Sequence, residues 1–385
     1  MDRSCLKLLY FSRGYTTHDR RYLQSFVESG CQVSYLRLLD ERLDARTLPK
    51  GVALVNWVGD GRPLKTLFDY FVRYIALRRI LSDVCPQVVI AGPVQTCAFL
   101  IALAGHKPLV AMSWGSDLLV DADRDRWTRA VTRHTLRHSQ GALGDCRAVR
   151  DKIHAFSHLS DDRIVTFPWG IDLQRFALRS SALSLRRDLR WTDNPVVIST
   201  RSWEPIYAVD VLVRAFARVH KQHPEARLLL LGDGSQGPMI HGLISDLNLT
   251  DIVYAPGRVP YELLPDYFCL ANLYVSSALS DGTSVSLLEA MACGLPVVVT
   301  NCPGNVEWVE PGKNGWLVAP GDAIALADAL NAALADPARL TPMKQSNITL
   351  ARNRADWNRN FPQLMRLLER LTNPPSPPND DRQVA

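Results

Sequence analysis

The sequence contains no pair of cysteines at the C-x-x-C spacing of a redox or zinc motif. Its eight cysteines stand singly, several of them inside apolar runs such as Ala290-Met-Ala-Cys293. This usage is typical of a reduced compartment rather than of a disulfide-bonded secreted domain. The N-terminus also lacks the apolar core of a signal peptide, because Arg13 interrupts the short run Leu8–Phe11. The sequence therefore predicts a cytoplasmic protein.

The chain also lacks a long unbroken apolar run. The stretch that comes nearest, residues 88–112, is interrupted by Gly92-Pro93 and by His106-Lys107-Pro108. A membrane-spanning helix needs about 20 predominantly apolar residues without such breaks. This stretch is therefore predicted to form a strand, a helix and a second strand.

Several motifs of nucleotide and metal chemistry are missing too. There is no P-loop, and Gly232-Asp-Gly234 is too short for a G-x-G-x-x-G fingerprint. Two pairs have H-x-x-x-H spacing, His134 with His138 and His154 with His158. Neither pair has the glutamate of a metalloprotease motif or an evident third ligand. No Asp-x-Asp dyad follows a predicted strand, since Asp161-Asp162 and Asp380-Asp381 are adjacent. The sequence predicts no metal and no other cofactor.

With 385 residues, 47% of them hydrophobic and 22% charged, the chain has the length and composition of two globular domains. The formal net charge of +5 is too small to indicate a nucleic-acid-binding protein. Between Arg124 and Arg190, however, 14 basic residues stand against 7 acidic ones. A phosphate-rich partner is therefore expected to face this stretch.

Short β-type runs alternate with helix-length segments in both halves of the chain. In the first half, strands are expected at residues 6–11, 32–36, 52–57, 87–91, 108–113, 141–143 and 163–167. The pattern restarts after Asp193-Asn-Pro195, with strands expected at residues 196–199, 227–231, 252–254, 273–275 and 296–300. Such alternation predicts an α/β protein of two Rossmann-like domains with parallel sheets, facing a central cleft where ligand binds.

The most informative segment is residues 280–300, Ser-Asp-Gly-Thr-Ser-Val-Ser-Leu-Leu-Glu-Ala-Met-Ala-Cys-Gly-Leu-Pro-Val-Val-Val-Thr. It predicts a loop of small residues, a helix ended by Gly294, and a buried strand. The N-terminus of this helix favours a phosphate or a polarised sugar oxygen. Asp281 and Glu289 border it. The donor-binding candidates at the helix start are Gly282, Thr283, Ser284 and Ser286.

Asp281-x7-Glu289, followed by Ala-Met-Ala-Cys-Gly-Leu-Pro-Val-Val, resembles the E-x7-E signature of family 4 glycosyltransferases, which are retaining enzymes of the GT-B fold. An aspartate stands where that family usually has its first glutamate. Further landmarks follow in the family's order, namely Phe167-Pro-Trp-Gly-Ile-Asp, Leu228–Gly234, Gly304-Asn-Val-Glu307 and Asn314-Gly-Trp-Leu-Val318. The resemblance covers nearly the whole chain and is strongest after Phe167.

The resemblance implies a division of the chain into four parts. Residues 1–170 are expected to form the acceptor-side domain, and residues 171–355 the domain that binds the nucleotide sugar. Residues 356–372 are expected to form a helix that packs back on the N-terminal domain. Residues 373–385, rich in proline, are expected to be a disordered tail.

The resemblance also assigns roles to residues of the second domain. Glu289 is expected to bind the ribose of the nucleotide sugar, and Asp281 the hydroxyls of its sugar. Arg201 follows a predicted strand and is expected on the donor diphosphate, which suits a guanidinium group. The family's accompanying lysine is absent. Tyr207 stands near its position, where it either binds a phosphate or packs.

In the first domain, Gly14 and His18 follow the first predicted strand, where a loop would approach the donor or the acceptor. His18 is either a substrate contact or a solvated loop residue. The segment Ser113-Trp-Gly-Ser-Asp117 resembles the family's H-G-x-D segment, with Trp114 in place of the histidine. Asp117 is expected to orient the acceptor or the sugar.

These residues predict a retaining, metal-independent glycosyltransferase with Asp281, Arg201 and Asp117 as its catalytic residues. It would move a sugar from a nucleotide-diphosphate sugar, its co-substrate, to a hydroxyl of a sugar or lipid-linked acceptor, in the assembly of a glycan, polysaccharide or glycolipid. Two alternatives stay open. One is a non-catalytic sugar-nucleotide binding protein, and the other is a sugar-nucleotide epimerase of the GT-B fold.

Two segments are candidates for contact with an anionic membrane. The spacing of Arg126, Arg129, Arg133 and Arg137 predicts a basic stripe on one helix face, opposite Trp127 and Val131. Residues 67–80 combine aromatic and aliphatic residues with three arginines. For each segment the alternative is an ordinary helix with its apolar face in the core and its arginines in water.

Overall fold

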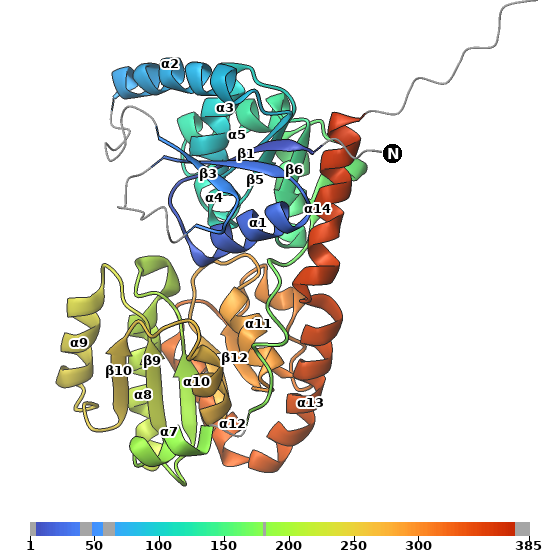
Figure 1. The fold of residues 1–385 in the computed structure, drawn as a ribbon. Coiled ribbons are helices and arrows are strands. Elements are labelled where there is room, and N and C mark those ends of the chain that lie inside the picture. The colour runs from blue at the N-terminus through green and yellow to red at the C-terminus, as the bar shows by residue number, and fades with distance from the viewer. Residues whose placement is uncertain (1–4, 39–47, 57–65, 180–181, 374–385) are drawn as a thin grey trace, which may run out of the picture. The chain divides into compact units, whose positions relative to one another are not determined.

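The computed structural model describes residues 5–38, 48–56, 66–179 and 182–373 (Figure 1). Contacts between residues divide the chain into two compact units. Unit 1 comprises residues 1–144, 149–166 and 361–385, and unit 2 comprises residues 145–148 and 167–360. The contacts thus change unit after Thr166, whereas the sequence places the boundary after residue 170. Apart from Asn373, the tail expected at residues 373–385 lies outside the described residues, as does residue 57 of the strand expected at 52–57.

Within its described residues, unit 1 is built on a seven-stranded parallel sheet in the order β3-β2-β1-β4-β5-β6-β7. The strands are β1 (Lys7–Ser12), β2 (Gln32–Arg37), β3 (Val52–Val55), β4 (Val88–Ala91), β5 (Leu109–Met112), β6 (Gly141–Gly144) and β7 (Ile164–Thr166). The strand order is that of a Rossmann-like sheet with one added edge strand, as the alternating pattern predicts.

Helices connect these strands. They are α1 (Thr17–Glu28), α2 (Leu67–Val84), the short turns η2 (Val94–Ala98), η3 (Asp121–Asp123) and η4 (Asp161–Arg163), α3 (Phe99–Ala104), α4 (Ser116–Leu119), α5 (Arg126–His138) and α6 (Arg147–Phe156). Helix α1 begins at a capping box, because the side chain of Thr16 accepts from the N–H of Asp19 and the Asp19 carboxylate accepts from the N–H of Thr16.

The C-terminal helix α14 (Trp357–Thr372) contributes its residues from Phe361 onward to unit 1. The ring of Phe361 meets Phe26 of α1 edge to face, with ring centroids 5.1 Å apart. Arg370 donates to the carbonyl oxygen of Asp162 at 2.8 Å. These contacts join the end of the chain to its first helix and to the turn before β7.

Unit 2 contains a six-stranded parallel sheet in the order β10-β9-β8-β11-β12-β13, as far as the structure describes it. Its strands are β8 (Val196–Ser199), β9 (Arg227–Leu231), β10 (Val253–Gly257), β11 (Leu273–Ser276), β12 (Val297–Thr300) and β13 (Gly315–Val318). Its helices are α7 (Ala182–Asp188), η5 (Pro205–Tyr207), α8 (Val209–Gln222), α9 (Gly237–Asp246), α10 (Leu264–Leu270), α11 (Val285–Ala292), η6 (Asn305–Glu307), α12 (Ala323–Ala335) and α13 (Pro337–Arg354).

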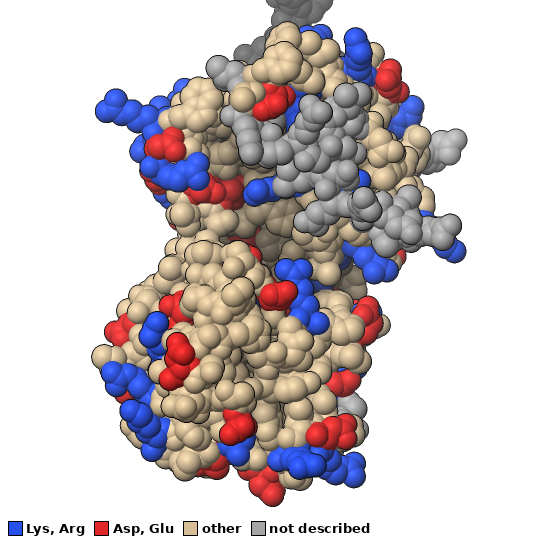
Figure 2. All heavy atoms as spheres, turned by 90° about the vertical axis from the view of Figure 1, so that its left-hand side faces the viewer, with Lys and Arg blue, Asp and Glu red and all other residues tan. Residues whose placement is uncertain are grey.

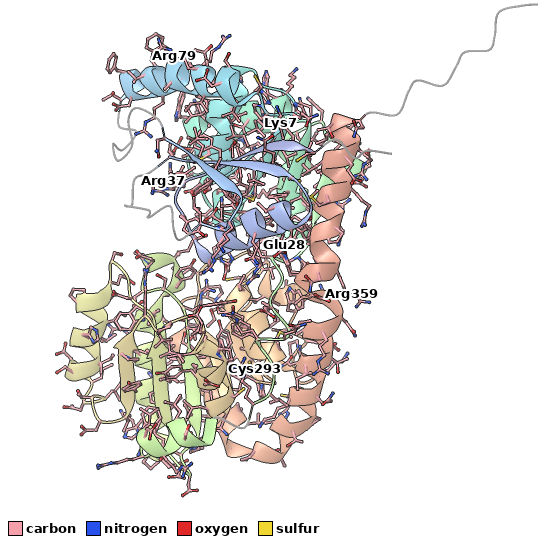
Figure 3. The ribbon with its side chains drawn as sticks, in the orientation of Figure 1. Lys7, Glu28, Arg37, Arg79, Cys293 and Arg359 are labelled. Atoms are coloured by element: carbon pink, nitrogen blue, oxygen red, sulfur yellow. The ribbon has the colours of Figure 1, made fainter. Side chains whose placement is uncertain are left out.

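The four central strands of the unit 2 sheet, β8, β9, β11 and β12, are buried on both faces. Neighbouring residues of a strand point to opposite faces, so Val197 and Leu228 belong to one core cluster while Ile198 and Leu229 belong to the other. Continuous apolar runs such as Arg227–Leu231 are explained by this double burial. Figure 3 shows the side chains of the unit, with Cys293 in its interior at the end of α11.

The strand order identifies one edge of the unit 2 sheet as a place for ligand. Strands β8 and β11 are hydrogen-bonded neighbours, but the chain leaves β8 for β9 on one side and leaves β11 for β12 on the other. A ligand site in such a sheet lies beyond the carboxyl ends of the strands, where the order reverses. Arg201 follows β8, and Asp281 lies in the loop between β11 and α11. The fold thus brings together residues that are far apart in the sequence.

The apolar stretch at residues 88–112 forms β4, η2, α3 and β5, as predicted. In the described part of the chain, no helix combines the length and the apolar character needed to cross a bilayer.

Candidate functional site

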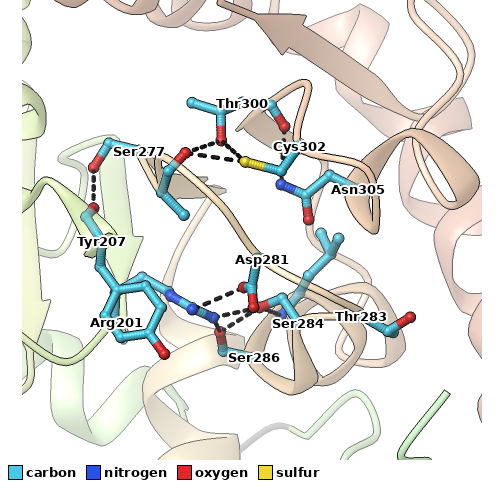
Figure 4. Close-up of polar contacts among 12 residues, drawn as sticks. Arg201, Tyr207, Ser277, Asp281, Thr283, Ser284, Ser286, Thr300, Cys302 and Asn305 are labelled. Atoms are coloured by element: carbon cyan, nitrogen blue, oxygen red, sulfur yellow. Dashed lines mark hydrogen bonds and ion pairs between the residues drawn. The ribbon is translucent and has the colours of Figure 1, made fainter. Parts of the chain in front are cut away.

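The site in unit 2 is centred on an ion pair. Nη2 of Arg201 lies 2.8 Å from Oδ2 of Asp281 (Figure 4). Arg201 is 9% exposed and the Asp281 side chain 19%, so both charges are largely removed from water. Two residues predicted to bind different parts of a donor therefore bind each other in this structure.

The guanidinium group of Arg201 is held from several sides. Its Nη1 donates to the hydroxyls of Ser284 at 2.5 Å and Ser286 at 3.2 Å. The hydroxyl of Ser286 also lies 2.7 Å from that of Tyr274 on β11. The ring of Tyr207 lies 4.0 Å from Cζ of Arg201, in cation–π geometry. Tyr207 packs on the arginine, which is one of the two roles that the sequence leaves open for it.

The contacts of Arg201 and Asp281 shift the pKa values of both side chains. Burial lowers the pKa of Arg201, but the charge of Asp281 and the neighbouring Tyr207 and Tyr274 outweigh burial and raise it. Burial raises the pKa of Asp281, and Arg201 opposes that shift. Arg201 is therefore positively charged at neutral pH.

A polar network fixes the strand ends behind the pair (Figure 4). Ser277 donates to the carbonyl oxygen of Tyr207 at 3.0 Å, which joins the end of β11 to the loop that carries Tyr207. Thr300 donates to the carbonyl oxygen of Ala278 at 2.6 Å, and Asn305 donates to that of Thr300 at 2.9 Å. These bonds hold the loops after β8, β11 and β12 together.

The loop before α11 is anchored by a residue that the sequence analysis did not select. Oδ2 of Asp145, which directly follows β6, accepts from the N–H of Thr283 at 2.9 Å. Thr283 also donates through its hydroxyl to the carbonyl oxygen of Asp145 at 2.7 Å. A Cβ atom on Gly282 would lie 2.2 Å from the Asp145 carboxylate, so only glycine fits there. The N–H of Thr283, expected to be free for a phosphate, is thus already bonded.

Helix α11 begins at Ser284, whose hydroxyl accepts from the N–H of Leu287 at 3.4 Å, and is followed by Gly294 with a φ of 81°. Glu289 lies on this helix and is 4% exposed. Its Oε1 accepts from the hydroxyl of Tyr261 at 3.1 Å. Nothing in the sequence pattern marks Tyr261, because it lies 28 positions from its partner in a loop without a motif.

The predicted residues of unit 1 are described separately, within that unit. Both oxygens of Asp117 accept hydrogen bonds. Oδ2 accepts from the N–H of Val94 at 3.0 Å. Oδ1 accepts from Ser113 Oγ at 2.6 Å, from the N–H of Trp114 at 2.9 Å and from the N–H of Leu118 at 3.0 Å. In this structure Asp117 therefore positions the loop after β5. Burial raises its pKa, and these hydrogen bonds oppose that shift.

His18 lies in the first turn of α1, with its ring 6.3 Å from that of Trp114. Burial, and to a smaller extent Arg21, lowers the pKa of His18 to about 4, so its ring is neutral at pH 7. The carbonyl oxygen of Gly14 accepts from Ser12 Oγ at 2.7 Å and from the hydroxyl of Tyr35 at 3.0 Å. These bonds fix the loop after β1.

Among the described residues, no group of three or more His, Cys, Asp or Glu side chains is arranged to hold a metal ion. The rings of His134 and His138 stack with centroids 4.1 Å apart, and His154 pairs with Asp161 at 2.9 Å. Two dyads of alternating spacing, Asp121-Ala-Asp123 and Asp123-Arg-Asp125, were not named from the sequence. They lie in η3 and at the start of α5, where their carboxylates pair with Arg124, Arg129 and Lys152.

The chain contains two Rossmann-like units. In unit 2, an arginine and the polar start of a helix lie where the strand order reverses. This is the architecture of a GT-B glycosyltransferase. Solved structures agree at the level of fold. Sucrose-phosphate synthase from Thermosynechococcus elongatus superposes with a TM-score of 0.81 at 20% identity, over 95% of this chain and 99% of that one. HepE from Anabaena in complex with UDP-glucose gives a TM-score of 0.77 at 19% identity, over 95% and 99% of the two chains.

The sequence matches the family model described as glycosyl transferases group 1 over residues 183–354. It is 29% identical over 298 residues to the GDP-mannose-dependent alpha-(1-6)-phosphatidylinositol monomannoside mannosyltransferase of Mycolicibacterium smegmatis, covering 72% of this chain and 74% of the relative. Residues 183–354 are a group 1 glycosyltransferase domain, and together with the fold and the relatives this domain supports a GT-B glycosyltransferase similar to family 4. The resemblance seen in the sequence is confirmed.

Removing Arg201 should destabilise unit 2. In Arg201→Met, the largely buried carboxylate of Asp281 loses its cation, so we expect the free energy of unfolding to fall by about 3 kcal/mol. Adding Asp281→Asn should restore part of the loss. Urea denaturation measures both, with Arg218→Met on the exposed face of α8 as control. Equal stability of Arg201→Met and the unchanged protein would contradict the importance of the pair.

Proposed function

We propose that this glycosyltransferase moves a sugar from a nucleotide-diphosphate sugar to an acceptor hydroxyl, with retention of anomeric configuration, in the assembly of a glycan, polysaccharide or glycolipid. The observation that carries the proposal is the Arg201 cluster before α11, where a buried cation and a helix N-terminus meet. Names of similar proteins support the donor class, since one relative is GDP-mannose-dependent and the HepE structure contains UDP-glucose.

Arg201 would exchange partners when the donor binds. The diphosphate has several anionic oxygens that a guanidinium group can bind through two N–H groups at once. The ring of Tyr207 and the hydroxyls of Ser284 and Ser286 hold the guanidinium in place. Because these groups are fixed before the donor arrives, stabilisation of the charge that develops on the departing diphosphate requires little reorganisation.

Glu289 and Asp281 would bind the two ends of the donor. Glu289 accepts a hydrogen bond from Tyr261 and, as a carboxylate with several lone pairs, can accept ribose hydroxyls as well. The diphosphate would replace Asp281 as the partner of Arg201, whose guanidinium stays in place, so the oxygens of Asp281 become available to hydroxyls of the transferred sugar. In the retaining reaction we propose that a departing phosphate oxygen takes the proton of the acceptor hydroxyl.

The test is a screen of nucleotide sugars with purified protein, followed by Glu289→Ala with the best donor. Loss of a charged hydrogen-bonding partner should weaken donor affinity by about 1.5–3 kcal/mol, while the exposed Glu262→Gln stays unchanged in calorimetry. Equal affinity of Glu289→Ala and the unchanged protein would contradict the role of Glu289. If the protein alters the nucleotide sugar without any acceptor, it is an epimerase. If it binds the nucleotide sugar but never turns it over, it is a sugar-nucleotide binding protein.

We further propose that transfer needs no metal ion, because Arg201 and the N-terminus of α11 supply positive charge beside the diphosphate. Activity should persist after dialysis against EDTA. The measurement is the rate of sugar transfer before and after chelation, with Mn²⁺ or Mg²⁺ added back. A complete loss that either ion reverses would contradict this proposal.

The acceptor is proposed to be a sugar or a lipid-linked sugar, reached at an anionic membrane. Arg126, Arg129, Arg133 and Arg137 are all exposed on α5, as the spacing predicts. Of the two residues expected opposite this stripe, Val131 is buried, whereas Trp127 is 68% exposed. An exposed tryptophan beside arginines suits the headgroup region of a bilayer.

Helix α2 offers a second surface for a lipid. Phe68 and Phe71 are 71% and 58% exposed. Together with Ile75 and Arg79 they line an open cavity of about 470 Å³. Arg79 lies on the helix that carries this surface (Figure 3). An apolar surface next to a cation can accept an acyl chain close to an anionic headgroup.

We propose no nucleic acid as a partner. On the face that Figure 2 shows, Lys and Arg side chains lie among Asp and Glu side chains and form no continuous basic field. Nucleic-acid binding relies on such a field to neutralise many phosphates at once.

Replacing the four arginines of α5 with glutamine should release the protein from anionic vesicles. Each well-placed arginine contributes about 1 kcal/mol near such a surface, less at high salt. Co-sedimentation with phosphatidylglycerol vesicles at low salt measures the effect, and unchanged nucleotide affinity is the control. Equally weak sedimentation of both proteins would contradict membrane contact through α5 and favour a soluble acceptor.

A further inference from the structure

Asp145 has an unusual place among the carboxylates of unit 2. It directly follows β6 and is 4% exposed, although no basic side chain forms an ion pair with it in the described part of the chain. Its Oδ2 accepts from Thr283 N–H at 2.9 Å and from Nε1 of Trp169 at 3.1 Å. Its Oδ1 is buried and accepts no hydrogen bond from any described residue. A carboxylate in these surroundings is costly to keep ionised.

Apart from the hydrogen bonds from Trp169 and Cys146, the contacts of Asp145 are on the loop that begins α11. Besides the two hydrogen bonds to Thr283, its carboxyl group fills the space beside Gly282 that a side chain would need. Asp281, the residue before Gly282, carries the negative charge that pairs with Arg201. Two carboxyl groups thus border one short loop, and a single arginine compensates one of them.

We propose that Asp145 is a positioning residue of the donor site, which holds the Gly282–Thr283 loop in place and takes up a proton when a nucleoside diphosphate binds. The inference rests on the proposed function, because it requires the diphosphate to bind at this loop. An incoming diphosphate adds negative charge beside two carboxyl groups. Protonation of Asp145 removes one of these repulsions without breaking the hydrogen bond that Oδ2 accepts from Thr283.

The electrostatics of the loop agree with this geometry. Burial, followed by the charge of Asp281, raises the pKa of Asp145 to about 7, and the hydrogen bonds from Thr283 and Cys146 oppose the shift. The titratable and charged groups that face Asp145 are Asp281 and the Cys146 thiol, with Arg201 acting through Asp281. Asp145 is therefore about half protonated at pH 7 before the ligand arrives.

The affinity for a nucleoside diphosphate should therefore depend on pH. If the diphosphate favours protonated Asp145, the pKa of this group rises further in the complex. The affinity is then highest below the pKa of the free protein and falls as the pH rises through it. For a group that stays protonated in the complex, we expect the dissociation constant to increase about tenfold between pH 6 and pH 8.

The experiment is titration calorimetry of the full chain with UDP and with GDP between pH 6 and pH 8, in buffers of different ionisation enthalpy. The unchanged protein should take up about half a proton per bound nucleotide at pH 7, beyond the uptake of Asp145→Asn. Asp145→Asn keeps an acceptor for Thr283 N–H and cannot titrate. It should bind with the low-pH affinity at every pH, apart from the nucleotide's own ionisation.

Asp145→Ala removes the acceptor as well, so it should bind at least about tenfold more weakly at every pH, while the exposed Asp246→Asn behaves like the unchanged protein. Melting temperatures show that each variant is folded. Identical pH profiles and proton uptake of Asp145→Asn and the unchanged protein would overturn the inference alone. A folded protein that binds neither nucleotide at any pH would overturn both the inference and the proposed function.

Discussion

The ion pair between Arg201 and Asp281 connects two crossovers of the same sheet, and the other polar groups at this edge are arranged around it. Two charges removed from water lose several kcal/mol of hydration each, which their attraction restores only with good geometry and further hydrogen bonds. The hydroxyls of Ser284 and Ser286 and the ring of Tyr207 supply these contacts. The pair is therefore stable because its charges and donors are compensated by groups of the same sheet edge.

The fold could be predicted because its signals are local and repeated. Short apolar runs alternate with helix-length segments, and double burial makes central strands such as β4, β9 and β12 largely apolar. Strand ends differ from the expected ones by at most three residues, as with β10, which was expected at residues 252–254 and spans Val253–Gly257. Strand β13 was not predicted separately, since its segment Gly315–Val318 was identified only as part of a family motif.

The site could be predicted only where its residues share a segment or a motif. The loop at residues 281–286 and the helix with Glu289 are one continuous run, and Arg201 follows a strand directly. Asp145 could not be found in this way, because its partner Thr283 is 138 positions away and a single aspartate after a strand has no distinctive pattern. Burial is also beyond the reach of the spacing. Helical spacing gives the angle of a side chain about the axis, but not how far the neighbouring elements extend to cover it, and Trp127 stays exposed.

Tyr207 and Asp145 both affect the charge around the proposed diphosphate position. Tyr207 stands near the position where the resembling family has a lysine, so this site has one cation fewer beside the diphosphate. Its ring instead holds Arg201 in place through a contact of 4.0 Å. A lysine lost next to two carboxyl groups would leave a more negative site, in which a diphosphate is repelled more strongly. The proposed protonation of Asp145 would remove one negative charge and so restore the balance that the lysine would have given. In this proposal Tyr207 and Asp145 belong to one electrostatic arrangement, in which Arg201 carries the fixed positive charge and Asp145 adjusts its own charge to the ligand.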